Sequence, residues 1–108
     1  MPKAKRKKVV YLAGPITGVP NYWEPFEKAD DRLTHHDVAV LNPSVLPQGM
    51  TNEQYVRICF GMIDSADLVL FLPGWLDSKG ATLERVYCDY VGKPVAFGIE
   101  QALEELKR

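Results

Sequence analysis

Short apolar runs alternate along the chain with longer stretches in which apolar residues recur every three or four positions. The apolar runs predict buried strands at 9–13, 38–41, 68–72 and 95–97. The stretches of helical period predict helices at 21–35, 51–66, 80–91 and 99–107. This alternation predicts an α/β fold, a small Rossmann-like or flavodoxin-like three-layer sandwich with a central parallel sheet of about four strands.

The predicted strand order is 2-1-3-4, because crossovers between parallel strands are right-handed and the glycine-rich turns follow the first and third strands. In that order these two strands are neighbours in the middle of the sheet. Their carboxyl ends lead into residues 14–18 and 73–80. Ligands of open α/β sheets bind at the carboxyl ends of the strands, so we expect both loops to border one crevice.

Charge and composition narrow the possible classes of protein. The 108 residues include 13 basic and 14 acidic ones, for a formal net charge of -1, so the chain as a whole lacks the excess of basic residues typical of nucleic-acid binding. Five of the first eight residues are Lys or Arg, which predicts a basic flexible tail over 1–8 and a single domain over 9–108. We interpret this tail as a solvated segment rather than as a nucleic-acid contact.

No apolar stretch approaches the roughly 20 residues of a membrane span, and no secretory leader is visible, so we expect a cytoplasmic protein with no membrane partner. Cys59 and Cys88 lack the spacing of metal ligands and are interpreted as buried thiols. We therefore expect neither a metal nor an organic cofactor.

The segment from Pro73 to Glu84 carries the strongest candidate chemistry. Ser78 and Gly80 lie at the predicted start of a helix, where free N–H groups attract anions. Glu84 follows one turn later and can project into the same crevice. A structural interpretation is equally open, with Ser78 as an N-cap and Glu84 as an acid favoured by the helix dipole.

Three motifs, taken together, resemble those of a known superfamily. They are Tyr-Leu-Ala-Gly-Pro-Ile-Thr-Gly at 11–18, Ala-Asp at 66–67, and Ser-x-Gly-x-x-x-Glu at 78–84. In order and spacing they resemble the nucleoside 2-deoxyribosyltransferases and the related 2'-deoxynucleoside 5'-phosphate N-hydrolases. The Leu-Pro-Gly-Trp and Ser-x-Gly-Ala elements are most similar to a compact branch of that superfamily found in phage and bacterial genomes.

The resemblance implies cleavage or transfer of the N-glycosidic bond of a (deoxy)nucleoside or nucleoside 5'-monophosphate through a glutamate nucleophile. Glu84 matches the nucleophile, and Tyr11 matches a hydroxyl that lies beside it. Ser78 and Gly80 match the site that holds the 5'-phosphate in the nucleotide-hydrolysing branch. The loop that encloses sugar and base matches Gly14, Ile16 and Gly18.

One position departs from the family pattern. Where characterised enzymes carry an aspartate that assists the sugar hydroxyls or the departing base, this chain has Cys59, and a thiol is a poor general acid. An alternative function is therefore a catalytically impaired module that binds or senses a nucleotide. A weaker one is an interaction domain that contacts nucleic acid through its basic tail.

Two further expectations concern the surroundings of the site. Trp75 either stacks on a nucleobase or pins its loop to the body, and the second role is slightly favoured. Relatives of similar type complete their sites across subunits, so the resemblance also implies a homodimer or larger homo-oligomer.

Overall fold

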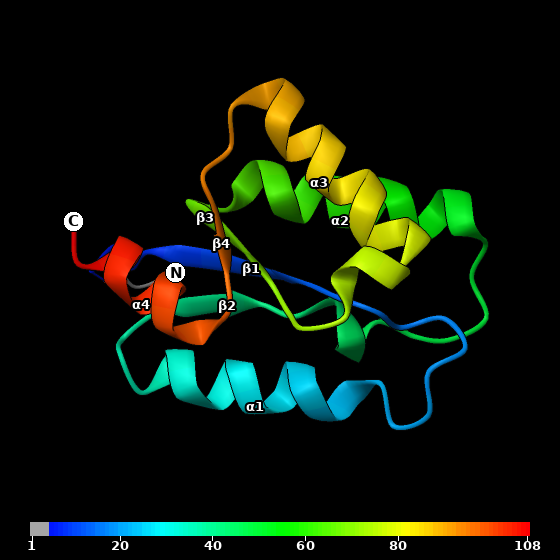
Figure 1. Ribbon diagram of the computed structural model, residues 1–108, viewed down its shortest axis with the longest axis horizontal. Coiled ribbons are helices and arrows are strands. Elements are labelled where there is room, and N and C mark those ends of the chain that lie inside the picture. Colours follow the sequence, from blue (N-terminus) through cyan, green and yellow to red (C-terminus); the bar gives the residue numbers. More distant parts are fainter. Residues whose placement is uncertain (1–4) are drawn as a thin grey trace.

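A computed structural model describes residues 5–108 and shows an α/β sandwich around one parallel sheet (Figure 1). The sheet order is β2-β1-β3-β4, and the predicted fold class and strand order are confirmed. The strands are β1 (Val9–Ala13), β2 (Ala39–Leu41), β3 (Leu68–Phe71) and β4 (Val95–Phe97). The helices are α1 (Trp23–Thr34), α2 (Asn52–Ser65), α3 (Lys79–Val91) and α4 (Ile99–Leu106), with short 3-10 turns η1 (Pro43–Val45) and η2 (Trp75–Asp77).

The two central strands are almost completely buried, as their continuous apolar sequences require. Successive side chains of a strand point to opposite faces, so Leu12 of β1 lies on one face and Tyr11 on the other. Tyr11 is paired in register with Val69, and Ala13 with Phe71. The face of the sheet to which the Tyr11 side chain points therefore follows from its position in β1.

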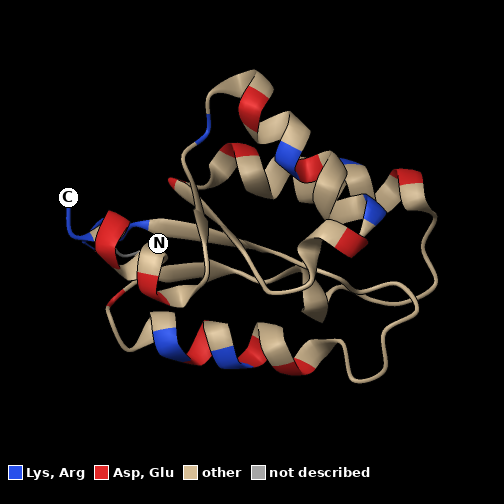
Figure 2. Cartoon of the chain, viewed as in Figure 1, with Lys and Arg blue, Asp and Glu red and all other residues tan. Residues whose placement is uncertain are grey.

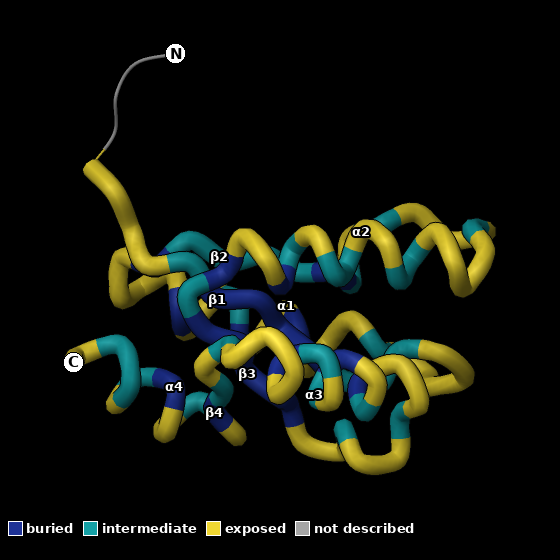
Figure 3. Tube along the Cα trace, turned by 90° about the horizontal axis from the view of Figure 1, so that it is seen from above, coloured by how far each residue is buried: buried dark blue, intermediate teal, exposed yellow. Residues whose placement is uncertain are grey.

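Each face of the sheet has its own apolar core. On one face α1 and α4 pack over a cluster that includes Leu12, Leu33 and Leu70. On the other face α2 and α3 pack over a cluster that includes Tyr11 and Ile63. Figure 1 shows the strands between α1 on one side and α2 and α3 on the other, and Figure 3 shows that the central strands are buried.

The observed helix ends differ from the predicted ones by at most two residues, and the ends at Val91 and Ile99 agree. The backbone explains the largest difference. Asn21, predicted as the first residue of a helix, has φ +52° and therefore lies in the left-handed region. Helix α1 begins only at Trp23. Helix α3 begins at Lys79, because Ser78 is its N-cap, and it ends at Val91, where Gly92 follows as the C-cap with φ +74°.

The N-terminal segment is described from Lys5 onward, so the first half of the predicted tail lies outside the described residues. Arg6 lies against the body through an ion pair with Asp67 at 2.8 Å. The N–H of Val9 and the Arg6 guanidinium both hold the pKa of Asp67 below its usual range. Asp67 thus fixes the start of β1 as well as contacting the tail.

Acidic and basic residues are interspersed along the helices of the described chain (Figure 2). This arrangement agrees with the small formal net charge of -1. Within residues 5–108, no helix combines the length and the apolar character needed to cross a bilayer.

Candidate active site

Glu84 is the sixth residue of α3 and faces the sheet. It is 8% exposed, and it is the one buried charged residue in the described part of the chain. Gly74, with φ +87°, turns the chain out of β3, and Ser78 then caps α3, so the helix begins next to the central strands. This local geometry directs a carboxylate into the layer between α3 and the sheet.

Tyr11 lies in the middle of β1 and is 1% exposed. Its hydroxyl donates a hydrogen bond to a carboxylate oxygen of Glu84. Burial, and then the negative charge of Glu84, raise the pKa of the Tyr11 phenol far above its usual value. Tyr11 therefore stays protonated at any physiological pH and remains a hydrogen-bond donor.

The carboxylate of Glu84 is bound by a neutral group, the hydroxyl of Tyr11. Burial raises its pKa to about 7, and the hydrogen bond from Tyr11 opposes that rise. Among the described residues no cation pairs with Glu84, since the neighbouring Arg85 is paired with Asp89. A buried carboxyl group that titrates near neutral pH without a cation is typical of a catalytic site rather than of a structural ion pair.

Cys59 of α2 completes this cluster. It is half-buried and packs against the same core as Tyr11. Burial raises the pKa of its thiol, and the charge of Glu84 raises it further, while the nearby Tyr11 hydroxyl opposes the rise. The structure thus brings Tyr11, Cys59 and Glu84 together from three elements, and burial favours the neutral forms of both the Tyr11 phenol and the Cys59 thiol.

Cys88 also lies beside Glu84, four residues later on the buried face of α3. The sequence predicted a buried thiol, and Cys88 is 0% exposed. Burial, with a contribution from the charge of Glu84, raises its pKa to about 11. Its closeness to Glu84 was not predicted, although two residues four apart on a helix share one face.

Ser78 and Gly80 lie at the N-terminus of α3, as expected. The hydroxyl of Ser78 accepts a hydrogen bond from the N–H of Ala81 at 3.2 Å, so Ser78 is an N-cap. The described residues provide no acceptor for the N–H groups of Lys79 and Gly80. A Cβ atom at Gly80 would meet only the Ser78 hydroxyl, at 4.0 Å, so no packing contact requires a glycine at this position.

The first loop contributes less to this cluster than the resemblance implies. Ile16 is half-buried against the core of α1 and α4, on the face of the sheet opposite Tyr11. Gly18 has φ +74° and lies in an exposed turn. A Cβ atom at Gly14 would lie 3.2 Å from the Cβ of Leu72, so close packing already explains that glycine. The binding roles of these three residues stay predictions.

Trp75 packs against aromatic side chains of the sheet. Its ring lies 5.0 Å from that of Phe71 and 5.5 Å from that of Phe97. The Arg85 guanidinium lies 5.4 Å from the Phe97 ring centre. These contacts fit the role of pinning the loop, and stacking on a nucleobase stays a prediction.

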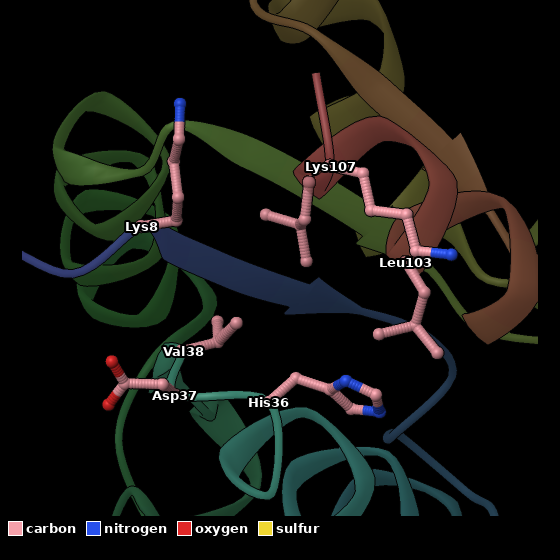
Figure 4. A pocket seen from close by; sticks show the side chains of 7 residues that line it. Lys8, His36, Asp37, Val38, Leu103 and Lys107 are labelled. Carbon is pink, nitrogen blue, oxygen red and sulfur yellow. The ribbon is translucent and has the colours of Figure 1, made fainter.

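Tyr11, Cys59 and Glu84 line neither of two shallow cavities on the described surface. A cavity of about 410 Å³ lies between α1 and η1, with Trp23 and Asn42 among its lining residues. Another, of about 160 Å³, lies at the amino ends of β1 and β2, beside the end of α4 (Figure 4). The charged ends of Lys8 and Asp37 point away from its centre. Within residues 5–108, no cluster of three or more His, Cys, Asp or Glu side chains is suited to a metal ion.

Fold and site together define a parallel α/β sandwich with a buried carboxyl group between its central strands and α3. Residues 8–97 match the family described as Domain of unknown function (DUF4406), and the chain belongs to this family. No curated protein matches the sequence.

Proposed function

We propose that this protein is an enzyme that cleaves or transfers the N-glycosidic bond of a (deoxy)nucleoside or nucleoside 5'-monophosphate, with Glu84 as the nucleophile. One observation carries the proposal: the buried charged residue is a carboxylate held by the hydroxyl of Tyr11 and paired with no cation of the described chain. The resemblance of the motifs at 11–18 and 78–84 to the nucleoside 2-deoxyribosyltransferases supports the same assignment.

The chemistry follows the retaining route of glycoside cleavage. A Glu84 oxygen bonds to C1' of the sugar while the bond from C1' to the base breaks and its electron pair leaves with the base. Water or a second base then displaces the carboxylate from C1'. Because Tyr11 donates to one carboxylate oxygen, it fixes the side-chain orientation and stabilises the ionised form.

The N-terminus of α3 suits the phosphate of a nucleotide substrate. The N–H groups of Lys79 and Gly80 are available there, and the positive end of the helix dipole favours an anion. Glu84 follows on the same helix, so one rigid element would position both phosphate and nucleophile. On this basis we favour a nucleoside monophosphate over a free nucleoside.

A second function is favoured by one specific observation. Burial keeps Cys59 a neutral thiol, and among the described residues no further acid lies in its cluster. Asp64, the nearest acid along α2, instead accepts a hydrogen bond from Tyr87 at 2.6 Å. Without an acid to protonate the departing base, the same pocket would bind or sense a nucleotide without cleaving it.

A panel of ribo- and deoxyribonucleoside monophosphates, with the matching nucleosides, separates the two functions. Released base is measured by chromatography and binding by calorimetry. We expect base release from at least one monophosphate, abolished by Glu84→Gln and retained by Glu100→Gln, which changes an exposed acid. Binding without release would establish the sensing function instead, and an absence of both would overturn both functions.

A further inference from the structure

The carboxylate of Glu84 is surrounded by groups that favour their neutral forms. The hydroxyl of Tyr11, on β1, donates a hydrogen bond to it. The thiols of Cys59, on α2, and Cys88, on α3, lie close enough for the charge of Glu84 to raise the pKa of both. Burial raises the pKa of all three groups further. In this part of the described chain, negative charge is therefore concentrated on the Glu84 carboxylate.

The charged side chains that lie next along the two helices are engaged elsewhere. Arg85 of α3 forms an ion pair with Asp89. Asp64 of α2 accepts a hydrogen bond from the hydroxyl of Tyr87 at 2.6 Å. Within residues 5–108, the carboxylate of Glu84 is thus balanced by no cation and is accompanied by no second carboxyl group that could supply a proton.

These surroundings restrict the leaving group of the proposed reaction, on which this inference rests. A neutral base leaves as an anion unless an acid protonates it, and such protonation contributes about 10²–10⁴-fold to a rate. An anion formed close to the buried Glu84 carboxylate would be costly, because two like charges would share a site of low polarity. A base that is already positively charged needs no proton, because the electron pair of the broken bond neutralises it.

A positively charged base also balances the charge of the nucleophile. The ring then carries one positive charge opposite the negative charge of Glu84, and the two sum to zero before and after the bond breaks. During cleavage the positive charge moves from the ring to the sugar, toward the carboxylate oxygen that attacks C1'. A neutral base would instead require opposite charges to separate within a buried site.

We propose that the substrate is an N-glycoside of a positively charged heteroaromatic base, such as a pyridinium or an N-alkylated purinium ring, on a (deoxy)ribose 5'-phosphate. An oxygen of Glu84 bonds to C1' while the bond from C1' to the ring nitrogen breaks, and the base leaves as a neutral molecule without receiving a proton. Water then displaces the carboxylate from C1', and the proton that the water loses passes to solvent. The products are the sugar phosphate and the neutral base.

Nicotinamide mononucleotide, which has a pyridinium ring, is the probe, and chromatography measures the released nicotinamide. We expect its kcat/KM to exceed that of every neutral-base ribonucleoside monophosphate by about 100-fold or more, the lower limit of what an acid contributes. The matched control substrate is its reduced form, which keeps the amide but carries no charge on the ring, and it should release no base. Glu84→Gln should abolish the release of nicotinamide.

The pH dependence tests whether an acid takes part. The profile of kcat/KM for nicotinamide mononucleotide should rise once, as Glu84 ionises near pH 7, and then stay level to about pH 9. A reaction that needs a protonated acid would add a descending limb. Asp77→Asn changes an exposed acid in the turn before α3, and it should alter neither the rate nor the profile. Circular dichroism verifies that this variant is folded.

The outcomes separate this inference from the proposed function. A preference for the charged ring below about 100-fold would overturn the inference, whereas release from neutral-base monophosphates would still support the proposed function. A descending limb below about pH 9, or a loss of activity in folded Asp77→Asn, would overturn the inference as well, because an acid would then take part. An absence of release from every substrate would overturn both.

Discussion

The hydroxyl of Tyr11 donates a hydrogen bond to the carboxylate of Glu84, and the two residues are 73 positions apart in the sequence. The bond joins the middle of β1 to α3 across one of the two cores. Because both side chains are buried, neither can exchange this partner for water without local opening. The bond therefore holds the proposed nucleophile in position and lowers its pKa at the same time.

Removal of the Tyr11 hydroxyl should move the pH dependence of the reaction. The hydrogen bond lowers the pKa of Glu84, so Tyr11→Phe should raise that pKa above its value of about 7. A hydrogen bond to a charged group contributes about 1.5–3 kcal/mol, which corresponds to a shift of about one to two pH units. The acidic limb of the profile of kcat/KM against pH should move upward by that amount, with a loss of about fivefold to fiftyfold near pH 7.

Tyr87→Phe is the matched control for this variant. Its hydroxyl also donates to a carboxylate, that of Asp64 at 2.6 Å, but the pair is exposed and joins α2 to α3 away from Glu84. The position of the acidic limb should not change in this variant. An unchanged limb in Tyr11→Phe as well would contradict the assignment of Glu84 as the group that must ionise.

Burial of Glu84 should also make the stability of the fold depend on pH. A carboxyl group with a folded-state pKa of about 7 and an ordinary value of 4.5 binds its proton more tightly when folded. Its contribution to stability is full below about pH 4.5 and is lost as the pH rises through 7. Glu84→Gln cannot ionise, so relative to wild type it should gain about 2–3 kcal/mol between roughly pH 5 and pH 8.

Chemical denaturation at several pH values measures this difference. The control is Glu53→Gln on the surface of α2, where the acid is 71% exposed and pairs with Arg57. Its stability relative to wild type should be nearly constant over the same range. A constant difference for Glu84→Gln would show that the carboxyl group is not buried as the structure has it.

The layering of the fold was predictable because it depends on patterns that are local in the sequence. Apolar runs such as 9–13 and 68–72 can be buried on both faces only as central parallel strands, and the strand order follows from the hand of the crossovers. The N-cap at Ser78 was predictable for the same reason. Helix starts were less predictable, because the left-handed backbone of Asn21 depends on how the preceding loop packs.

The site was only partly predictable. Glu84 and Tyr11 were paired through the resemblance, since residues 73 positions apart share no local signal in the sequence. The shift in the pKa of Glu84 depends on burial and on the absence of a nearby cation, which only the three-dimensional packing determines. The position of Ile16 on the other face also could not be predicted, because a loop has no periodicity that fixes the direction of its side chains.

Gly14 should be required for packing at the end of β1, independently of any ligand. A Cβ atom there would lie 3.2 Å from the Cβ of Leu72 and 3.3 Å from the Cζ of Phe26. Both neighbours are buried, so Gly14→Ala should destabilise the fold by about 1–3 kcal/mol through overpacking. Thermal or urea denaturation measures the loss.

Gly61→Ala is the opposite case and serves as the control. Gly61 lies within α2, and a Cβ atom there would meet nothing within 4 Å. Alanine favours a helix interior over glycine, so this variant should gain about 0.5–1 kcal/mol. Equal effects of the two substitutions would contradict the close packing of Gly14.

The Ser78 hydroxyl has two possible roles, as a structural N-cap and as part of a phosphate site, and substitutions can separate them. As an N-cap it accepts from the N–H of Ala81, so Ser78→Ala should cost about 0.5–2 kcal/mol of stability. Thr51→Ala removes an equivalent cap, that of α2, and should cost a similar amount. Stability alone therefore does not separate the two roles, and a kinetic comparison is needed.

If Ser78 also helps to bind phosphate, its loss should raise KM for a nucleoside monophosphate and leave KM for the matching nucleoside unchanged. A loss of one such hydrogen bond to a charged group corresponds to about a tenfold or greater change in KM. Thr51→Ala should change neither KM, because it alters the cap of a different helix. Equal effects of Ser78→Ala on both substrates would assign Ser78 to capping alone and would leave the N–H groups of Lys79 and Gly80 as the phosphate donors to test next.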